Sequence, residues 1–228
     1  HPTISRRQRQ MCIRDRFSKI PRKIKNTMSE IVVQKFGGTS VGTVDRIDSV
    51  AEIIKNASKS NKIVVVVSAM GGETNRLVDL AKAFGDDPDK REFDALVSTG
   101  ETVSSALLAM ALHSKGVKAK SFSASQISMR TTSSYSKAKI LDVDAQKILD
   151  VVENDTIPII TGFQGVTEGG DVTTLGRGGS DTTAVAIAAQ IAATRCDIFT
   201  DVDGIFTTDP SVVPNAKKLD SITMEEML

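Results

Sequence analysis

The chain has 228 residues, of which 40% are hydrophobic and 25% are charged, values typical of a globular protein with one large domain. Its formal net charge of +1 divides unevenly, because residues 1–28 carry nine basic groups and one acid whereas residues 29–228 carry 20 basic and 27 acidic groups. The acidic body argues against nucleic acid as the main partner. No uninterrupted apolar run reaches the ~20 residues of a membrane helix. The two cysteines, Cys12 and Cys196, are too few for a metal cluster.

The basic segment 1–28 has no apolar core, so it is not a secretory signal. Because Met28 is followed directly by a strand pattern, we interpret it as the natural start and residues 1–28 as a non-native or disordered extension. An organellar transit peptide and a nucleic-acid-binding arm are the alternatives. Since one of the two cysteines lies in this extension, we expect no disulfide. We expect instead a reducing, cytoplasmic location.

Strand and helix patterns alternate from residue 31 onward, which indicates an α/β fold with a mainly parallel sheet. The β-branched run in 62–68 is typical of a strand buried on both faces. Up to residue 114 the predicted elements are strands over 31–36 and 62–68, a helix with Val44, Ile47, Val50, Ala51 and Ile54 on one face, a helix from about Glu73, a loop at 86–88, and a helical region over about 92–114 interrupted near Thr99-Gly100.

The second half continues the alternation but contains more glycine, serine and threonine. The predicted elements are a strand over 117–122, an irregular region over 121–136, a helix capped by Asp144 and ending near Asn154, a strand over 157–161, a flexible hairpin or lid over 162–179, a helix over 180–193, a strand over 195–200, a hairpin signal at Asp203-Gly204 and a new helix after Thr223.

Lys35, Gly37 and Gly38 stand where the first predicted strand ends. Glycines let backbone N–H groups approach a phosphate, the following helix presents its positive end, and the lysine adds a point charge. The order is not that of a Walker A loop, because the lysine precedes the glycines. An ordinary turn is the alternative.

Two further segments, 68–75 and 98–101, combine small or hydroxylated residues with acids. The first segment follows a strand and lies at the sheet edge where α/β folds bind ligands, which favours a ligand-binding role. The alternative is a tight strand-to-helix loop with Thr74 as the helix cap. In the second, Glu101 at a helix start receives an ammonium group, or is simply favoured there by the helix dipole.

The segment 173–183 places Arg177 among glycines, exposed and suited to forked recognition of a carboxylate or phosphate. Asp181 beside a phosphate site is costly unless it pairs with a lysine, and pairing with Lys35 explains both residues. A glycine loop and a helix capped by Ser180 or Asp181 is the alternative.

The segment 200–210 follows a strand and combines acids, hydroxyls and Phe206. Acceptor groups here can bind the ribose and adenine of a nucleotide, and the phenyl ring can pack on the base. A hairpin with a proline at its exit is the alternative.

Together these segments resemble the aspartate kinases of the amino-acid kinase family. The resemblance covers about 31–228 and rests on the phrases KFGGTSVG, VVVVSAMGGETNRLVDLA, STGETVSSAL, TGFQGV, DVTTLGRGGSDTTAVAIAA and TDVDGIFTTDPSVVPNAKKL. It implies a three-layer αβα sandwich that transfers the γ-phosphoryl group of ATP to the side-chain carboxylate of L-aspartate, giving 4-phospho-L-aspartate for lysine, threonine and methionine synthesis. Mg²⁺ would be carried by the nucleotide, with no metal site made by the protein alone.

The resemblance also implies roles for single residues. Lys35 and Asp181 would be catalytic. The substrate would be bound by Thr74, Glu101, Arg177, Gly178, Gly179 and Ser180, and the nucleotide by Lys35, Phe36, Gly37, Gly38, Ser68, Thr200, Asp201, Phe206, Thr207, Asp209 and Pro210. No general base is needed, because the aspartate carboxylate is already ionised at neutral pH.

Three departures limit the comparison. Phe206 stands where the family often has tyrosine, a later lysine near the nucleotide would lie beyond Leu228, and the paired ACT regulatory domains are absent. The whole protein would form a homo-oligomer or bind a regulatory subunit. The alternatives are another amino-acid kinase, acting on acetylglutamate, glutamate or UMP, and a nucleotide-binding fragment without turnover.

Overall fold

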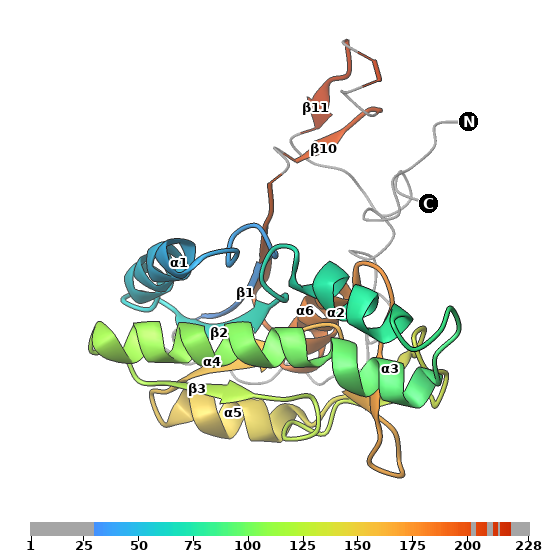
Figure 1. The fold of residues 1–228 in the computed structure, drawn as a ribbon. Helices are drawn as coiled ribbons and strands as arrows, with labels where there is room; N and C mark the ends of the chain where they lie inside the picture. Colours follow the sequence, from blue (N-terminus) through green and yellow to red (C-terminus); the bar gives the residue numbers. More distant parts are fainter. Residues whose placement is uncertain (1–29, 202–203, 209–211, 214, 220–228) are drawn as a thin grey trace.

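A five-stranded parallel sheet forms the centre of the computed structural model, which describes residues 30–201, 204–208, 212–213 and 215–219 (Figure 1). All pairings within this sheet are parallel. In spatial order its strands are β3 (Ala119–Phe122), β6 (Ile157–Thr161), β2 (Lys62–Val67), β1 (Ile31–Phe36) and β9 (Arg195–Phe199). The predicted parallel sheet is therefore confirmed, and β1 lies between β2 and β9.

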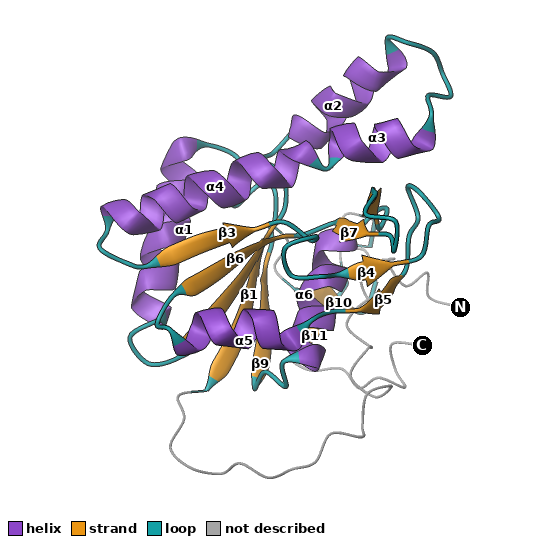
Figure 2. Cartoon of the chain, turned by 90° about the horizontal axis from the view of Figure 1, so that it is seen from below, coloured by secondary structure: helices purple, strands orange, loops and turns teal. Residues whose placement is uncertain are grey.

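Helices cover both faces of this sheet, so the predicted three-layer αβα sandwich is confirmed (Figure 2). One layer contains α1 (Val44–Ala57) and α4 (Thr99–Ser114), and the other contains α5 (Ala145–Glu153) and α6 (Gly179–Gln190). Two more helices, α2 (Glu73–Lys82) and α3 (Lys90–Val97), precede α4 in the chain.

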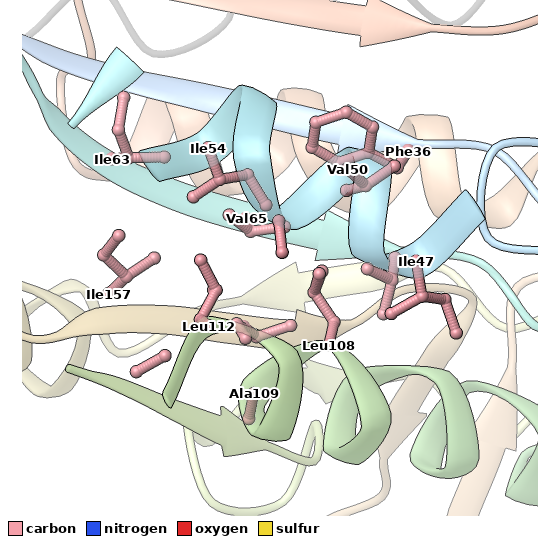
Figure 3. Close-up of a cluster of buried hydrophobic side chains, with 14 of the residues drawn as sticks. Phe36, Ile47, Val50, Ile54, Ile63, Val65, Leu108, Ala109, Leu112 and Ile157 are labelled. Atoms are coloured by element: carbon pink, nitrogen blue, oxygen red, sulfur yellow. The ribbon is translucent and has the colours of Figure 1, made fainter. Parts of the chain in front are cut away.

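Two apolar cores hold the layers together. Under α1 and α4, Phe36 and Val65 pack with Ile54, Leu108 and Leu112 (Figure 3). The alternate residues of the same strands face the other side. There Val33, Val64 and Val66 join Ile148 of α5 and Ile187 of α6. Burial on both faces explains why β1 and β2 are continuous apolar runs and not alternating ones.

The helix boundaries follow local capping. Thr43 accepts a hydrogen bond from Arg46 N at 3.3 Å and begins α1, and Asp144 caps α5 as predicted. The prediction was wrong for α6, because the cap is Gly178 in the left-handed region at φ 75° and makes no side-chain cap bond. Likewise α2 begins after Gly72, and not at a Thr74 cap. Val44 is 69% exposed and does not belong to the buried face of α1.

A second, four-stranded sheet has three strands in the segments predicted to be irregular (121–136) or a hairpin or lid (162–179), and a fourth strand, over 140–142, in a stretch with no predicted element. Its strands, in spatial order, are β5 (Ile140–Asp142), β4 (Arg130–Thr131), β7 (Gln164–Val166) and β8 (Val172–Thr174). The predicted hairpin is present, because β7 and β8 pair antiparallel. Figure 2 shows this sheet beyond the carboxyl ends of β3 and β6.

The remaining differences concern element ends. The strand predicted from 117 begins at Ala119, and the helix predicted to reach 193 ends at Gln190. The hairpin signal at Asp203-Gly204 does not pair β9 with its successor, because β10 (Ile205–Phe206) pairs with β11 (Lys218–Leu219). This hairpin projects from the sandwich in Figure 1. Asp203 and the helix predicted after Thr223 lie outside the described residues.

One described helical stretch, Lys90–Ser114, is long and apolar enough to cross a membrane by length and composition alone. Half of its apolar window is buried inside the protein, and Ser98 divides it into α3 and α4. Leu108 and Leu112 pack in the core under α1. The stretch is therefore a core element of the sandwich.

Candidate active site

The carboxyl ends of β1, β2, β6 and β9 open on one edge of the sheet, and the predicted site segments begin there. Gly37 N donates to Phe199 O at 3.0 Å, and Ser68 N donates to Phe36 O at 3.1 Å. The Phe36 and Phe199 rings stack with centroids 4.6 Å apart. These contacts fix the ends of three adjacent strands relative to one another.

A lysine–aspartate pair lies at this edge. Lys35 Nζ is 2.6 Å from Asp181 Oδ1, and the two side chains are 9% and 15% exposed. The pairing predicted from the sequence is therefore confirmed. Lys35 points to the α6 side because its neighbours Gln34 and Phe36 alternate to the other face. Asp181 stands in the first turn of α6, where the helix dipole favours an anion.

The glycine loop after β1 packs directly on the loop after β2. A Cβ added to Gly38 would lie 2.9 Å from Ala69 O, so only glycine allows this approach. A Cβ on Gly37 would meet Lys35 Nζ at 3.5 Å, which places that loop beside the charged pair. The loop thus presents backbone next to a lysine, as an anion site requires.

Glu101 lies in the first turn of α4 and is 3% exposed. Its Oε1 accepts a hydrogen bond from Ala69 N at 3.1 Å, whereas its Oε2 is buried and has no hydrogen-bond partner among the described residues. Burial raises the pKa of this carboxyl to about 8, against the opposing effect of the Ala69 hydrogen bond. A buried carboxyl with one unsatisfied oxygen is suited to receive a cationic group.

Arg177 lies in the short connection between β8 and α6, and it is exposed. Its flanking glycines, Gly176 and Gly178, have φ values of 76° and 75°. The connection is anchored, because Leu175 N donates to Phe163 O at 2.9 Å. The other residues assigned to the substrate differ from Arg177: Gly179 and Ser180 are buried in the start of α6, and Thr74 is half-buried on α2.

The segment predicted to bind the nucleotide is described only in part. Thr200 and Asp201 are exposed, and Thr200 Oγ1 donates to Asp201 Oδ1 at 3.2 Å. Thr207 closes the small hairpin, because its hydroxyl accepts from Lys217 N at 3.1 Å. Phe206 belongs to β10. Asp209 and Pro210 lie outside the described residues.

Sequence reasoning missed Asp94, a fully buried acid in α3. Its carboxylate accepts four hydrogen bonds, from the backbone and hydroxyl groups of Ser136 and Thr174. A signal was present, because this acid stands on the same helix face as buried Val97. A charged residue on an apolar face needs partners, but the sequence could not say which.

Two cavities on the described surface lie away from the predicted site. These shallow cavities, of about 470 and 300 Å³, lie at the opposite edge of the sheet, around Val117 and Thr156. Neither cavity is lined by a residue of the predicted site. Among the described residues, no group of three or more histidine, cysteine, aspartate or glutamate side chains could hold a metal ion.

A parallel α/β sandwich with a lysine–aspartate pair, a glycine loop and a buried acid at the carboxyl ends of its strands has the features of an α/β domain suited to anionic small molecules. Residues 30–228 match the amino acid kinase family, and the chain belongs to this family.

Relatives of this chain are aspartate kinases by name. The chain is 57% identical over 199 residues to an aspartate kinase of Stutzerimonas stutzeri and 54% identical to an aspartokinase of Geobacillus stearothermophilus. These matches cover 87% of this chain but 48% and 49% of the relatives. The chain therefore spans about half the length of the curated relatives it matches.

Solved structures agree. Aspartokinase III of E. coli in complex with aspartate and ADP superposes with a TM-score of 0.76 at 32% identity, covering 84% of this chain and 54% of that one. Aspartate kinase from Synechocystis gives 0.74 at 46% identity, covering 86% of this chain and 32% of that one.

Proposed function

We propose that the protein carrying this chain is an aspartate kinase, which transfers the γ-phosphoryl group of ATP to the side-chain carboxylate of L-aspartate. The observation that carries the proposal is the position of Ala69. Its N–H binds Glu101, and its carbonyl oxygen touches the Gly38 loop. The acid that we propose to bind the ammonium and the loop that we propose to bind phosphate therefore lie side by side, which supports phosphorylation of a free amino acid. The relatives named aspartate kinase support the same substrate.

Each group has a part in this mechanism. Glu101 receives the substrate ammonium through its unpaired oxygen, and the cation stabilises the ionised carboxylate against the effect of burial. Arg177 binds the α-carboxylate. Asp181 holds Lys35 in place beside the glycine loop, and Lys35 counters the negative charge of the transferring phosphoryl group.

The nucleophile needs no deprotonation, because an aspartate side chain is ionised at neutral pH. The remaining barrier is repulsion between that carboxylate and the triphosphate. Mg²⁺ carried with ATP would lower this repulsion by supplying positive charge, as it commonly does for phosphate substrates. The Thr200–Pro210 segment would hold the nucleoside.

The wider assignments belong to the whole protein. We propose a cytoplasmic enzyme that forms a homo-oligomer or binds a regulatory subunit, with ACT domains outside the residues of this chain. In the same proposal, residues 1–28 are outside the catalytic domain 29–228; the family match begins at residue 30.

The test is acyl phosphate formation, trapped with hydroxylamine, together with ADP release. It uses the full-length protein that carries this chain, with L-aspartate, L-glutamate, N-acetylglutamate and UMP offered separately. Of these four acceptors, we expect only L-aspartate to give product. Turnover of another substrate without aspartate turnover would assign the site to a different amino-acid kinase. Nucleotide binding without any turnover would reduce it to a binding domain.

A further inference from the structure

The carboxylate of Asp94 is the meeting point of three segments that are far apart in the sequence. Its Oδ2 accepts from the backbone N–H groups of Ser136 and Thr174, both at 2.8 Å. Its Oδ1 accepts from the hydroxyls of the same residues, at 3.1 and 2.9 Å. Asp94 has no exposed surface. Four charge-assisted hydrogen bonds to a buried carboxylate make a strong, geometrically specific junction.

Two of the three joined segments lead to a substrate group of the proposed reaction. Thr174 ends β8, three residues before Arg177. On the other side, α3 ends at Val97 and passes through Ser98 into α4, whose first turn contains Glu101. Asp94 therefore connects the helix pair that carries Glu101 to β8, the strand that precedes Arg177.

Two neighbouring contacts reinforce this connection. The Gln164 side chain at the start of β7 donates to the carbonyl of Ser98, at the α3–α4 junction. Ala138 N donates to Thr174 O at 2.9 Å, so the turn that contains Ser136 is bonded to β8 independently of Asp94. Asp94 links both of them to α3.

We propose that Asp94 is a positioning residue for the amino-acid substrate: it fixes the separation of Glu101 and Arg177, and so sets affinity for the substrate without touching it. The inference rests on the proposed function, because Glu101 and Arg177 are taken to bind the ammonium and the α-carboxylate. Small displacements of binding groups have large effects, since a misplacement of about 1 Å costs roughly 100-fold in rate or affinity.

The geometry distinguishes hydrogen bonding from charge as the source of this effect. In Asp94→Asn, the amide oxygen can take the Oδ2 position and accept both N–H bonds. Its NH₂ group can then donate to the two hydroxyl oxygens, which accept as well as donate. Asparagine therefore reproduces the junction, whereas Asp94→Ala removes all four bonds.

A matched control lies near the tip of the same hairpin. Asp171 also joins these segments, because it accepts from Arg91 Nε at 3.0 Å and from the Tyr135 hydroxyl at 3.2 Å. Its side chain is 36% exposed, and it lies at the far end of the hairpin from Arg177. Asp171→Ala thus weakens the same assembly away from the substrate groups.

The experiment compares steady-state kinetics of the full-length protein with those of its variants. We expect Asp94→Ala to raise KM for L-aspartate by about 10- to 100-fold and to leave KM for ATP within about 2-fold. Asp94→Asn should stay within about 3-fold of wild type in both constants, and Asp171→Ala within about 2-fold. An unchanged KM for aspartate in a folded Asp94→Ala protein overturns the proposal, and so does an equal rise in both KM values.

If Asp94→Ala does not fold, Thr174→Val decides the matter, because it removes one hydroxyl bond and keeps the backbone bond to Asp94. We expect it to raise KM for aspartate alone, and a wild-type value overturns the proposal. Wild-type protein without aspartate turnover would instead refute the proposed function. Amide hydrogen exchange then tests the junction separately: Asp94→Asn should retain protection at Thr174 and Ser136, and loss of protection there contradicts the hydrogen-bond account.

Discussion

Lys35 Nζ and Asp181 Oδ1 are 2.6 Å apart, although one residue lies near the end of β1 and the other lies in the first turn of α6. The parallel sheet brings them together, because α6 crosses the face of β1 and packs on Val33 through Ile187. The lysine is thereby held on the side of the glycine loop with little freedom, so its charge requires no reorganisation when a phosphate arrives.

Removing either member of this pair should abolish turnover. We expect Lys35→Met and Asp181→Asn each to lower kcat by about 100- to 1000-fold, as for a single preorganised electrostatic group. The measurement is aspartate-dependent ADP release by the full-length protein. Lys115→Met, which breaks an ion pair with Asp48 and Glu52 away from the site, is the control. Near-normal turnover in either site variant would refute the assigned role.

Glu101 should make stability depend on pH. Its pKa is raised from 4.5 to about 8 in the folded protein, so between these values the folded state binds a proton that the unfolded state has lost. The stabilisation from the protonated form is complete below about pH 4.5 and is lost as pH rises through about 8, at no more than ~1.4 kcal/mol per pH unit.

The measurement is urea unfolding of wild type and Glu101→Gln at a series of pH values. Glutamine keeps the acceptor for Ala69 N but does not titrate. Wild type should therefore lose stability relative to Glu101→Gln as pH rises from about 5 to about 8. Glu73→Gln is the control, because Glu73 pairs with Arg76 near the surface and its pKa is lowered. A difference that does not vary with pH would show that burial does not perturb Glu101.

Arg177→Ala should act mainly on the amino-acid substrate. The guanidinium provides forked hydrogen bonds that lysine cannot reproduce, so Arg177→Lys should restore little of the lost affinity. We expect KM for aspartate to rise by about 10- to 100-fold, equivalent to ~1.4–2.7 kcal/mol, with KM for ATP unchanged. Loss of ATP binding with a normal KM for aspartate would move this residue to the nucleotide side.

Gly38→Ala should push the two site loops apart, because the new Cβ would lie 2.9 Å from Ala69 O. Backbone cannot move aside as a flexible side chain does, so we expect a loss of about 1–3 kcal/mol in unfolding free energy together with weaker ATP binding. Gly169→Ala is the matched control, since its Cβ would come no closer than 3.7 Å to Thr167. Equal effects of the two substitutions would contradict the packing argument.

Leu108→Ala tests the core beneath α1. Leu108 has no exposed surface, and the substitution should cost about 2–5 kcal/mol by removing buried methyl groups and leaving a cavity. Met110→Ala, on the same helix but 64% exposed, should change stability by less than about 0.5 kcal/mol. Chemical unfolding of both variants measures the difference.

The main sheet was predictable because each of its strands can be recognised from its own residues. In β2 every residue after Lys62 is a buried β-branched residue, a pattern that only a strand covered on both faces explains. The second sheet was predictable only for the β7–β8 hairpin. Strands β4 and β5 were missed, because they have two and three residues, too few to show a period.

One contact of the candidate site was predictable, because chemistry restricts the partner. An aspartate near the expected phosphate-binding loop needs a cation, and Lys35 is that cation. Asp94 lacks such a restriction, since its partners are neutral groups 42 and 80 positions away in the chain. The cap of α6 was misassigned because a left-handed glycine, Gly178, replaced the expected side chain. Each miss reflects a long-range contact or a backbone conformation that residue type does not determine.

Helix α4 contains Glu101, the proposed ligand of the substrate ammonium, in its first turn, and it continues into the core through Leu108 and Leu112. Near its other end, Lys115 is clamped to α1 by Asp48 and Glu52. A substitution that tilts the buried half of α4 therefore also moves its first turn, where Glu101 lies. In the proposed enzyme, core substitutions in α4 that adapt stability to a new growth temperature would also change substrate affinity. Thermal stability and substrate affinity would then evolve together.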